Sequence, residues 1–210
     1  MAPELVAGVG DWVGGCCDGV GLTVSDGGGG VGVAGTGVSS WESKIVIRTY
    51  LETLGLPLTV LTPTAFMELM TDKGFFPGAS TWNVMPRLTG ADLPISWISV
   101  EDLGRIAALA FADPDRFVGT ELKLTADVRS NAECRTIWRT VTGRKPPHFP
   151  MPTWLFERIV GTDLTTMWRW LRKARPQFDP GPTRELLPTV MTVEQWLNQR
   201  HAPSPRTVGA

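Results

Sequence analysis

Apolar and polar positions alternate regularly only beyond the glycine-rich start of the chain. From Ser39 onward, Ile47, Leu51 and Leu54 recur at helical spacing, and a glycine and a proline follow them. Ser39 and Glu42 have the S-x-x-E spacing of a capping box, in which each residue's side chain accepts from the other's backbone amide. The pattern predicts a helix that begins at Ser39 and buries this apolar stripe.

Short β-prone runs predict the strands. The run 58–61 is closed by Pro63 and is typical of a buried parallel strand. A second apolar run, 95–100, leads into a helix opened by Ser99, and 121–125 is a further strand candidate. Helix, tight turn and strand in succession form half of an α/β unit, so we expect parallel strands joined by crossovers.

Helices dominate the rest of the chain. The capping-box spacing recurs at Ser130 with Glu133 and at Thr192 with a glutamine, and 153–175 is predicted as one or two helices broken near Gly161. The pattern therefore indicates a mixed α/β fold that becomes helix-rich near its end.

Composition divides the chain where the periodicity begins. Residues 1–37 hold 13 of the 23 glycines and no lysine or arginine. Ordering so many glycines costs much backbone entropy, so we expect poor order there, and the bias also suits a non-native leader from a misassigned start. We expect a globular domain at 38–200 and a flexible tail at 201–210.

Overall composition excludes several classes of protein. The 210 residues are 42% hydrophobic and 20% charged with a net charge of −1, which favours a packed core and gives no electrostatic footprint for nucleic acid or an anionic membrane. No apolar run approaches the roughly 18 residues of a membrane span, and the first basic residue is Lys44, so a secretory signal is not predicted. The three cysteines form neither a disulfide framework nor a spaced metal set. We expect a cytoplasmic protein without a metal site.

Two overlapping G-x-G-x-x-G patterns, at 27–32 and 30–35, lie in the glycine tract. Such a loop can offer backbone amides to a pyrophosphate when it links a strand to a helix. A tract this rich in glycine matches the spacing by chance, and the run 22–24 before it is short for a strand. We therefore favour low complexity over a dinucleotide loop.

Few side chains are candidates for catalysis, cofactor binding or metal binding. Tyr50 is the only tyrosine and Leu54 lies four positions on, so a Tyr-x-x-x-Lys acid pair is excluded. Lys44 begins the predicted buried stripe, where its ammonium can either turn toward a bound polar ligand or extend to water. The two histidines, His148 and His201, belong to no hydrolase or metal-ligand motif.

Five short segments carry a resemblance when taken in order. They are 39–44 (SSWESK), 58–70 (LTVLTPTAFMELM), 98–104 (ISVEDLG), 119–127 (GTELKLTAD) and 140–144 (TVTGR). Together they resemble, over about 38–200, the second half of the NmrA-like family, an atypical branch of the short-chain dehydrogenases/reductases. The resemblance implies a Rossmann-type fold whose C-terminal lobe covers the nicotinamide end of NADP or NAD.

The resemblance also implies a cofactor site. Lys44 matches the lysine that hydrogen-bonds the nicotinamide ribose. The loop beside the nicotinamide is matched by Pro63, Thr64, Ala65 and Phe66. Ser40 stands where catalytic relatives carry the acid tyrosine, so no catalytic residue is assigned.

The segment before Ser39 is too short for the family's first half, because four strands with crossovers need far more than 37 residues. We therefore expect an α/β, partial Rossmann-like domain that lacks its N-terminal strands and carries a helix-rich C-terminal lobe. Exposed strand edges would favour self-association. We expect this chain alone to bind NADPH weakly or not at all.

The leading interpretation is an N-terminally incomplete NAD(P)-dependent oxidoreductase-like protein that acts on a small molecule and contacts neither nucleic acid nor membrane. A non-catalytic cofactor-sensing regulatory module is the alternative that the missing tyrosine favours, and a nonfunctional remnant is a third. Whether the chain is an enzyme stays open at this point.

Overall fold

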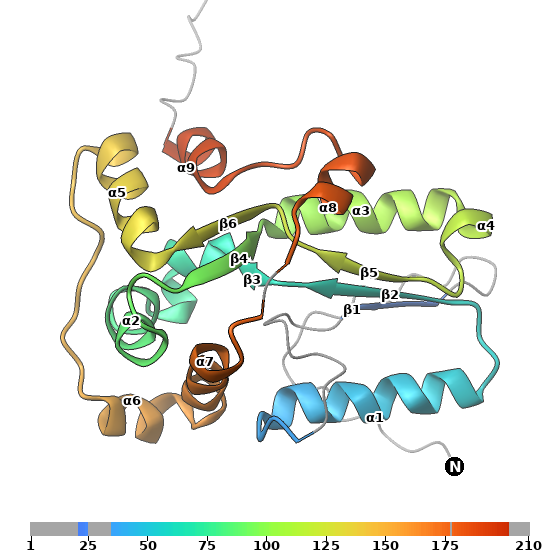
Figure 1. Ribbon diagram of the computed structural model, residues 1–210, viewed down its shortest axis with the longest axis horizontal. Coiled ribbons are helices and arrows are strands. Elements are labelled where there is room, and N and C mark those ends of the chain that lie inside the picture. The colour runs from blue at the N-terminus through green and yellow to red at the C-terminus, as the bar shows by residue number, and fades with distance from the viewer. Residues whose placement is uncertain (1–20, 25–34, 177, 202–210) are drawn as a thin grey trace, which may run out of the picture.

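The structure, a computed structural model, describes residues 21–24, 35–176 and 178–201 (Figure 1). The strands in these ranges are β1 (Gly21–Val24), β2 (Leu58–Pro63), β3 (Ala65–Phe66), β4 (Pro94–Ile98), β5 (Glu121–Leu124) and β6 (Asp127–Ser130). The α-helices are α1 (Ser39–Thr53), α2 (Met85–Thr89), α3 (Val100–Ala112), α4 (Pro114–Phe117), α5 (Asn131–Thr142), α6 (Thr153–Val160), α7 (Asp163–Ala174), α8 (Gly181–Leu186) and α9 (Val193–His201). Single turns of 3₁₀ helix lie at Met67–Met70 and Lys73–Phe75, and a π-helical turn lies at Ser80–Val84.

The first sheet has the order β1-β2-β5, and both pairs are parallel. All six residues of β2 are buried, which confirms the prediction of a buried parallel strand followed by a crossover. β1 includes the short run 22–24 of the glycine-rich segment. Of the two G-x-G-x-x-G patterns beyond it, only Gly35 falls within the described residues.

The second sheet has the order β3-β4-β6, with β3 parallel and β6 antiparallel to β4. The chain leaves the first sheet for the second at Thr64, between β2 and β3. It does so again at Thr125 and Ala126, between β5 and β6, where the Ala126 N–H donates to the Trp97 carbonyl at 2.8 Å. The chain therefore passes from the first sheet to the second at two neighbouring places.

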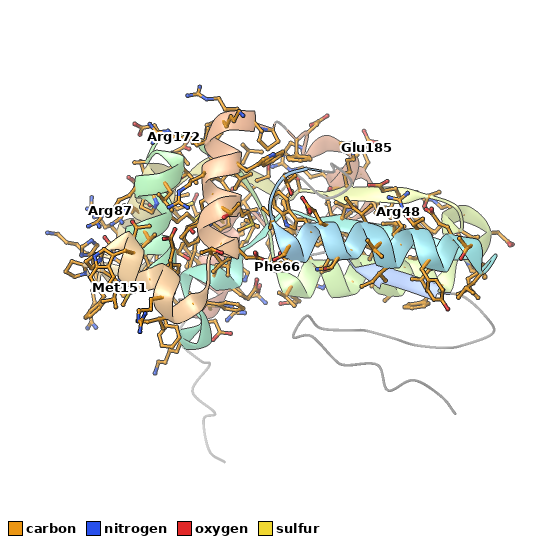
Figure 2. The ribbon with its side chains drawn as sticks, turned by 90° about the horizontal axis from the view of Figure 1, so that it is seen from below. Arg48, Phe66, Arg87, Met151, Arg172 and Glu185 are labelled. Carbon is orange, nitrogen blue, oxygen red and sulfur yellow. The ribbon has the colours of Figure 1, made fainter. Side chains whose placement is uncertain are left out.

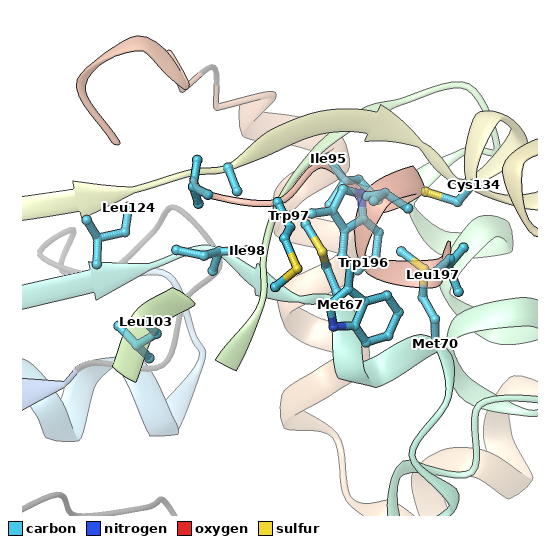
Figure 3. Close-up of a cluster of buried hydrophobic side chains, with 14 of the residues drawn as sticks. Met67, Met70, Ile95, Trp97, Ile98, Leu103, Leu124, Cys134, Trp196 and Leu197 are labelled. Atoms are coloured by element: carbon cyan, nitrogen blue, oxygen red, sulfur yellow. The ribbon is translucent and has the colours of Figure 1, made fainter. Parts of the chain in front are cut away.

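The core gathers around the second sheet (Figure 3). Trp97 of β4 lies fully buried, and its indole N–H donates to the Arg129 carbonyl of β6 at 3.0 Å. Met67 and Met70 from the turn after β3 and Trp196 from α9 pack in the same cluster. The C-terminal helix therefore closes the core that the middle of the chain builds.

Local helix signals in the second half of the chain are confirmed. Ser130 caps α5 by accepting from the Glu133 amide at 3.2 Å, and the Glu133 carboxylate accepts from the Ser130 N–H at 2.7 Å. Thr192 and Gln195 make the same reciprocal pair at the start of α9. The break near Gly161 separates α6 from α7.

In α1 the predicted bounds hold, but the predicted capping and burial are wrong. The N-cap is Val38, and the Glu42 carboxylate reaches back to the Gly37 N–H at 3.0 Å instead of to Ser39. Trp41 is the one buried residue of the helix, whereas Ile47 is 39% and Leu54 52% exposed. The helix packs on the sheet with a different face, which lies about 100° around the helix axis from the predicted apolar stripe.

Within the described ranges, no helix combines the length and apolar character needed to cross a membrane. The same residues contain no cluster of three or more side chains suited to hold a metal ion.

Candidate functional site

A cleft opens where β2 ends. The parallel strands β2 and β5 finish side by side, with Pro63 opposite Leu124. In open α/β sheets, ligands bind in the crevice outside the carboxyl ends of the strands, near a point where the strand order changes. The described lining consists of Thr64 and Ala65 after β2, residues 93–96 leading into β4, and Leu171, Pro176 and Phe178 from the C-terminal lobe.

Thr64 holds the floor of this cleft in place. Its backbone N–H and its Oγ1 both donate to the Leu124 carbonyl, each at 3.1 Å, and its side chain is buried. The two bonds link the segment after β2 to the end of β5. The loop is therefore a rigid surface, as a binding platform beside a flat ring requires.

The other loop residues flank the cleft. Pro63 is the buried last residue of β2, and Phe66 is half-buried in β3 opposite Ile98. Of the four loop positions predicted from the resemblance, Thr64 and Ala65 line the cleft, and Pro63 and Phe66 bracket them.

Lys44 lies on the face of α1 that also carries Trp41 and Arg48, and it is half-buried. Arg48 Nη1 bonds Glu121 Oε2 of β5 at 2.8 Å, and this hydrogen bond raises the pKa of Arg48. The same Glu121 carboxylate accepts from Thr62 Oγ1 of β2 at 3.3 Å. This face of α1 therefore turns toward β2 and β5.

The start of α1 lies near the carboxyl end of β2 (Figure 1). Because α1 and β2 run in opposite directions, the first turns of the helix accompany the last residues of the strand. Seen from below, α7 approaches the N-terminal end of α1 (Figure 2). Leu171 of α7 lines the cleft, so one helix of the C-terminal lobe reaches both features.

No residue of the described cleft lining carries an ionisable side chain. Its surface is built mainly from aliphatic residues, proline and one phenylalanine, with the hydroxyls of Thr64 and Ser96 as polar groups. Tyr50 is exposed on α1 and has Leu54 one turn on. The enclosed volume of this cleft is about 20 Å³, and its described lining contains no proton-transfer group.

The resemblance implied that the C-terminal lobe covers the nicotinamide end of the cofactor, but the sequence did not indicate which residues of that lobe line the cleft. Leu171 has the ordinary spacing of a core residue in an amphipathic helix, and Phe178 follows a short loop without a motif. Nothing local signals that either residue meets Thr64. The basic residues Arg169, Arg172 and Lys173 near the end of α7 are exposed, and Arg169 pairs with Glu157 at 2.7 Å.

Comparisons with known structures agree with this geometry. A nucleoside-diphosphate-sugar epimerase from Staphylococcus aureus is 15% identical, with a TM-score of 0.66 over 86% of this chain and 64% of that one. NmrA, a negative transcriptional regulator solved in complex with NAD, is 16% identical, with a TM-score of 0.59 over 86% and 64% of the two chains. Leucoanthocyanidin reductase from Vitis vinifera, solved with NADPH, is 16% identical, with a TM-score of 0.62 over 88% and 66%.

These likenesses show a shared Rossmann-like α/β fold, and the chain spans about two thirds of the length of each of these structures. The model of the NmrA-like family matches residues 31–197, which is most of the sequence. The five segments, the sheet topology and the family match lead to one conclusion: the chain belongs to the NmrA-like family.

Proposed function

We propose that this chain is an NAD(P)-binding, oxidoreductase-like protein whose cofactor site is the cleft at the carboxyl end of β2. The position of that cleft carries the proposal, because it lies where open α/β sheets bind dinucleotides. The NAD and NADPH complexes of similarly folded proteins support it.

In this proposal the nicotinamide end of the cofactor lies against the apolar lining of the cleft. Thr64 and Ala65 form a rigid edge for the ring, and Leu171 and Phe178 face it from the C-terminal lobe. Lys44 would donate to hydroxyls of the adjoining ribose. Bound there, the cofactor supplies hydride chemistry, while the chain orients it and excludes water.

For the substrate we propose a small carbonyl or quinone compound, since an apolar cleft without an ionisable lining suits a neutral acceptor of hydride. We further propose a cytoplasmic location, which the sparse cysteines and the buried free thiol of Cys134 support. Self-association would use the outer edges of the first sheet, where β1 and β5 lie in the described order.

A titration with NADPH tests the cofactor site. We expect weak binding, seen as saturation-transfer NMR signals from the nicotinamide protons and competed by NAD. Lys44→Ala should weaken it about 10- to 100-fold, because a lost hydrogen bond from a charged group is worth about 1.5–3 kcal/mol.

Lys145→Ala is the matched control, since it removes a lysine from an exposed loop. Equal signals from wild type and Lys44→Ala would contradict the assigned role of Lys44, and a wild-type chain without any signal would overturn the proposed function. Oxidation of NADPH in the presence of carbonyl or quinone substrates then measures whether binding leads to turnover.

A further inference from the structure

The first turn of α1 is bound by a carboxylate from a distant part of the chain. Asp163, the first residue of α7, accepts from Ser39 Oγ at 2.6 Å through Oδ1 and from the Ser40 N–H at 3.0 Å through Oδ2. The partners are more than 120 positions apart in the sequence. This contact joins the helix that carries Lys44 to the C-terminal lobe.

The Asp163 carboxylate provides the hydrogen-bond acceptor that α1 lacks at its N-terminus. The first amides of a helix have no partner within the helix, and the N-cap residue here, Val38, has no side-chain acceptor. A negative charge also suits the N-terminal ends of both α1 and α7. The hydrogen bond from Ser39 holds the pKa of Asp163 below its ordinary value, so this group is ionised at neutral pH.

A ring contact from the same side of α7 also joins it to this turn, and Gly37 lies close to Thr166 on that side. Trp170 packs edge-on against the buried Trp41 ring, with the ring centroids 5.3 Å apart. Gly37 has a φ of +74°, and a Cβ there would lie 3.7 Å from Thr166 Cγ2. Positions 163, 166 and 170 recur at helical spacing, so one stripe of α7 faces the start of α1.

The same helix reaches the cofactor cleft. Leu171 follows Trp170 and lines the cleft beside Thr64. Lys44 lies one helical turn beyond Ser40, the residue whose amide Asp163 accepts. The helix that carries Lys44 and the cleft are therefore both in contact with α7.

We propose that Asp163 is a positioning residue, which fixes the first turn of α1 to the C-terminal lobe and so places Lys44 for dinucleotide binding. The effect of Asp163 on dinucleotide binding rests on the proposed function, whereas the contact between Asp163 and α1 is present without a cofactor. Asp163 acts through Lys44 and touches no cofactor.

A double-mutant cycle with NADPH as the probe tests the coupling between the two residues. Asp163→Ala should weaken NADPH binding several-fold when Lys44 is present. In a Lys44→Ala background the same change should have little further effect, because the group that it positions is gone. Equal losses in both backgrounds would overturn the positioning role, since a general loss of structure acts regardless of Lys44.

Amide hydrogen exchange on the ligand-free chain tests the contact separately. Asp163→Ala should speed exchange at residues 40–45, and Asp163→Asn, which keeps an acceptor oxygen, should restore part of the protection. Asp72→Ala is the control, because Asp72 caps only a local turn through the Gly74 N–H. If Asp163→Ala does not fold, Ser39→Ala removes the side-chain half of the contact from the other helix.

The two readouts separate the possible failures. A wild-type chain that gives no NADPH signal overturns the proposed function and, with it, the functional consequence of Asp163. Unchanged exchange at residues 40–45 in Asp163→Ala overturns the positioning role even when NADPH binds normally.

Discussion

At the scale of single residues, two carboxylates, those of Glu133 and Asp163, accept from backbone amides at the starts of helices. The Ser130 N–H donates to the Glu133 carboxylate, and this bond lowers the pKa of Glu133. Asp163 is held in the same way by Ser39 and Ser40. Because each bond favours the ionised carboxylate, each also links the stability of a helix start to pH.

We expect Glu133→Gln to show this link. Glutamine keeps an acceptor for the Ser130 N–H but cannot ionise. Since the folded pKa of Glu133 is depressed, its charge stabilises the protein above the ordinary value of about 4.3, and that contribution is lost as the pH falls through the folded pKa. Wild type should be the more stable protein near neutral pH, and the two should converge in acid.

Urea unfolding across the acid range measures the difference between the two proteins. Thr136→Ala serves as a comparison, because it lies exposed on the same helix and does not titrate. A difference between wild type and Glu133→Gln that stayed constant with pH would show that the charge of Glu133 plays no part.

At the scale of elements, α3 illustrates how a simple period specifies burial. Ser99 caps the helix by accepting from the Asp102 amide at 3.0 Å, and the apolar face with Leu103, Ile106 and Ala110 is buried in the core. Ile106 is 0% exposed at the centre of that face, whereas Leu109 is 39% exposed on the other side. α3 therefore carries one fully buried and one partly exposed apolar residue that can be compared directly.

Ile106→Ala should lower the free energy of unfolding by about 2–5 kcal/mol, because it removes buried methyl groups and leaves a cavity. Leu109→Ala, in the same helix, should change it by under about 1 kcal/mol. Chemical denaturation followed by circular dichroism compares the two variants. Similar losses at both positions would mean that α3 does not pack as described.

At the scale of the whole molecule, two buried acids tie the last helix to the core. Asp102 Oδ2 accepts from Ser99 Oγ at 2.8 Å and from the Met191 N–H at 3.0 Å. Asp127 Oδ2 accepts from the Val193 N–H at 3.1 Å. These bonds fix the segment that leads into α9, and α9 in turn places Trp196 in the core (Figure 3).

Asp102→Ala should destabilise the protein by at least about 2 kcal/mol, because it leaves the buried Met191 amide without its acceptor. Hydrogen exchange should accelerate at Met191 and along α9. Asp115→Ala, which removes an exposed acid from α4, should stay within about 0.5 kcal/mol of wild type. Unchanged protection of α9 in Asp102→Ala would show that other contacts hold this helix.

Much of the element order could be predicted from the sequence, because caps, turns and periods act within a few residues. The helices after Ser99 and Ser130 begin where their capping signals place them. Local signals could not predict which face of α1 meets the rest of the protein, because the contacts on that face, Arg48 with Glu121 and Trp41 with Trp170, join residues far apart in the sequence. The family resemblance predicted the loop after β2 as a binding loop. The structure shows that, of its four predicted residues, Thr64 and Ala65 line the cleft.

From the sequence alone, the α/β order of the chain and the limits of most of its longer helices could be predicted, and the family resemblance added a candidate cofactor loop. Only the tertiary structure decided that α7 meets both the cleft and the first turn of α1, and that Asp163 reaches Ser39 across the chain. The physical reason is the separation along the chain of the residues that interact. Local patterns express the energies of neighbouring residues, whereas a contact between distant residues is selected by the packing of the whole molecule.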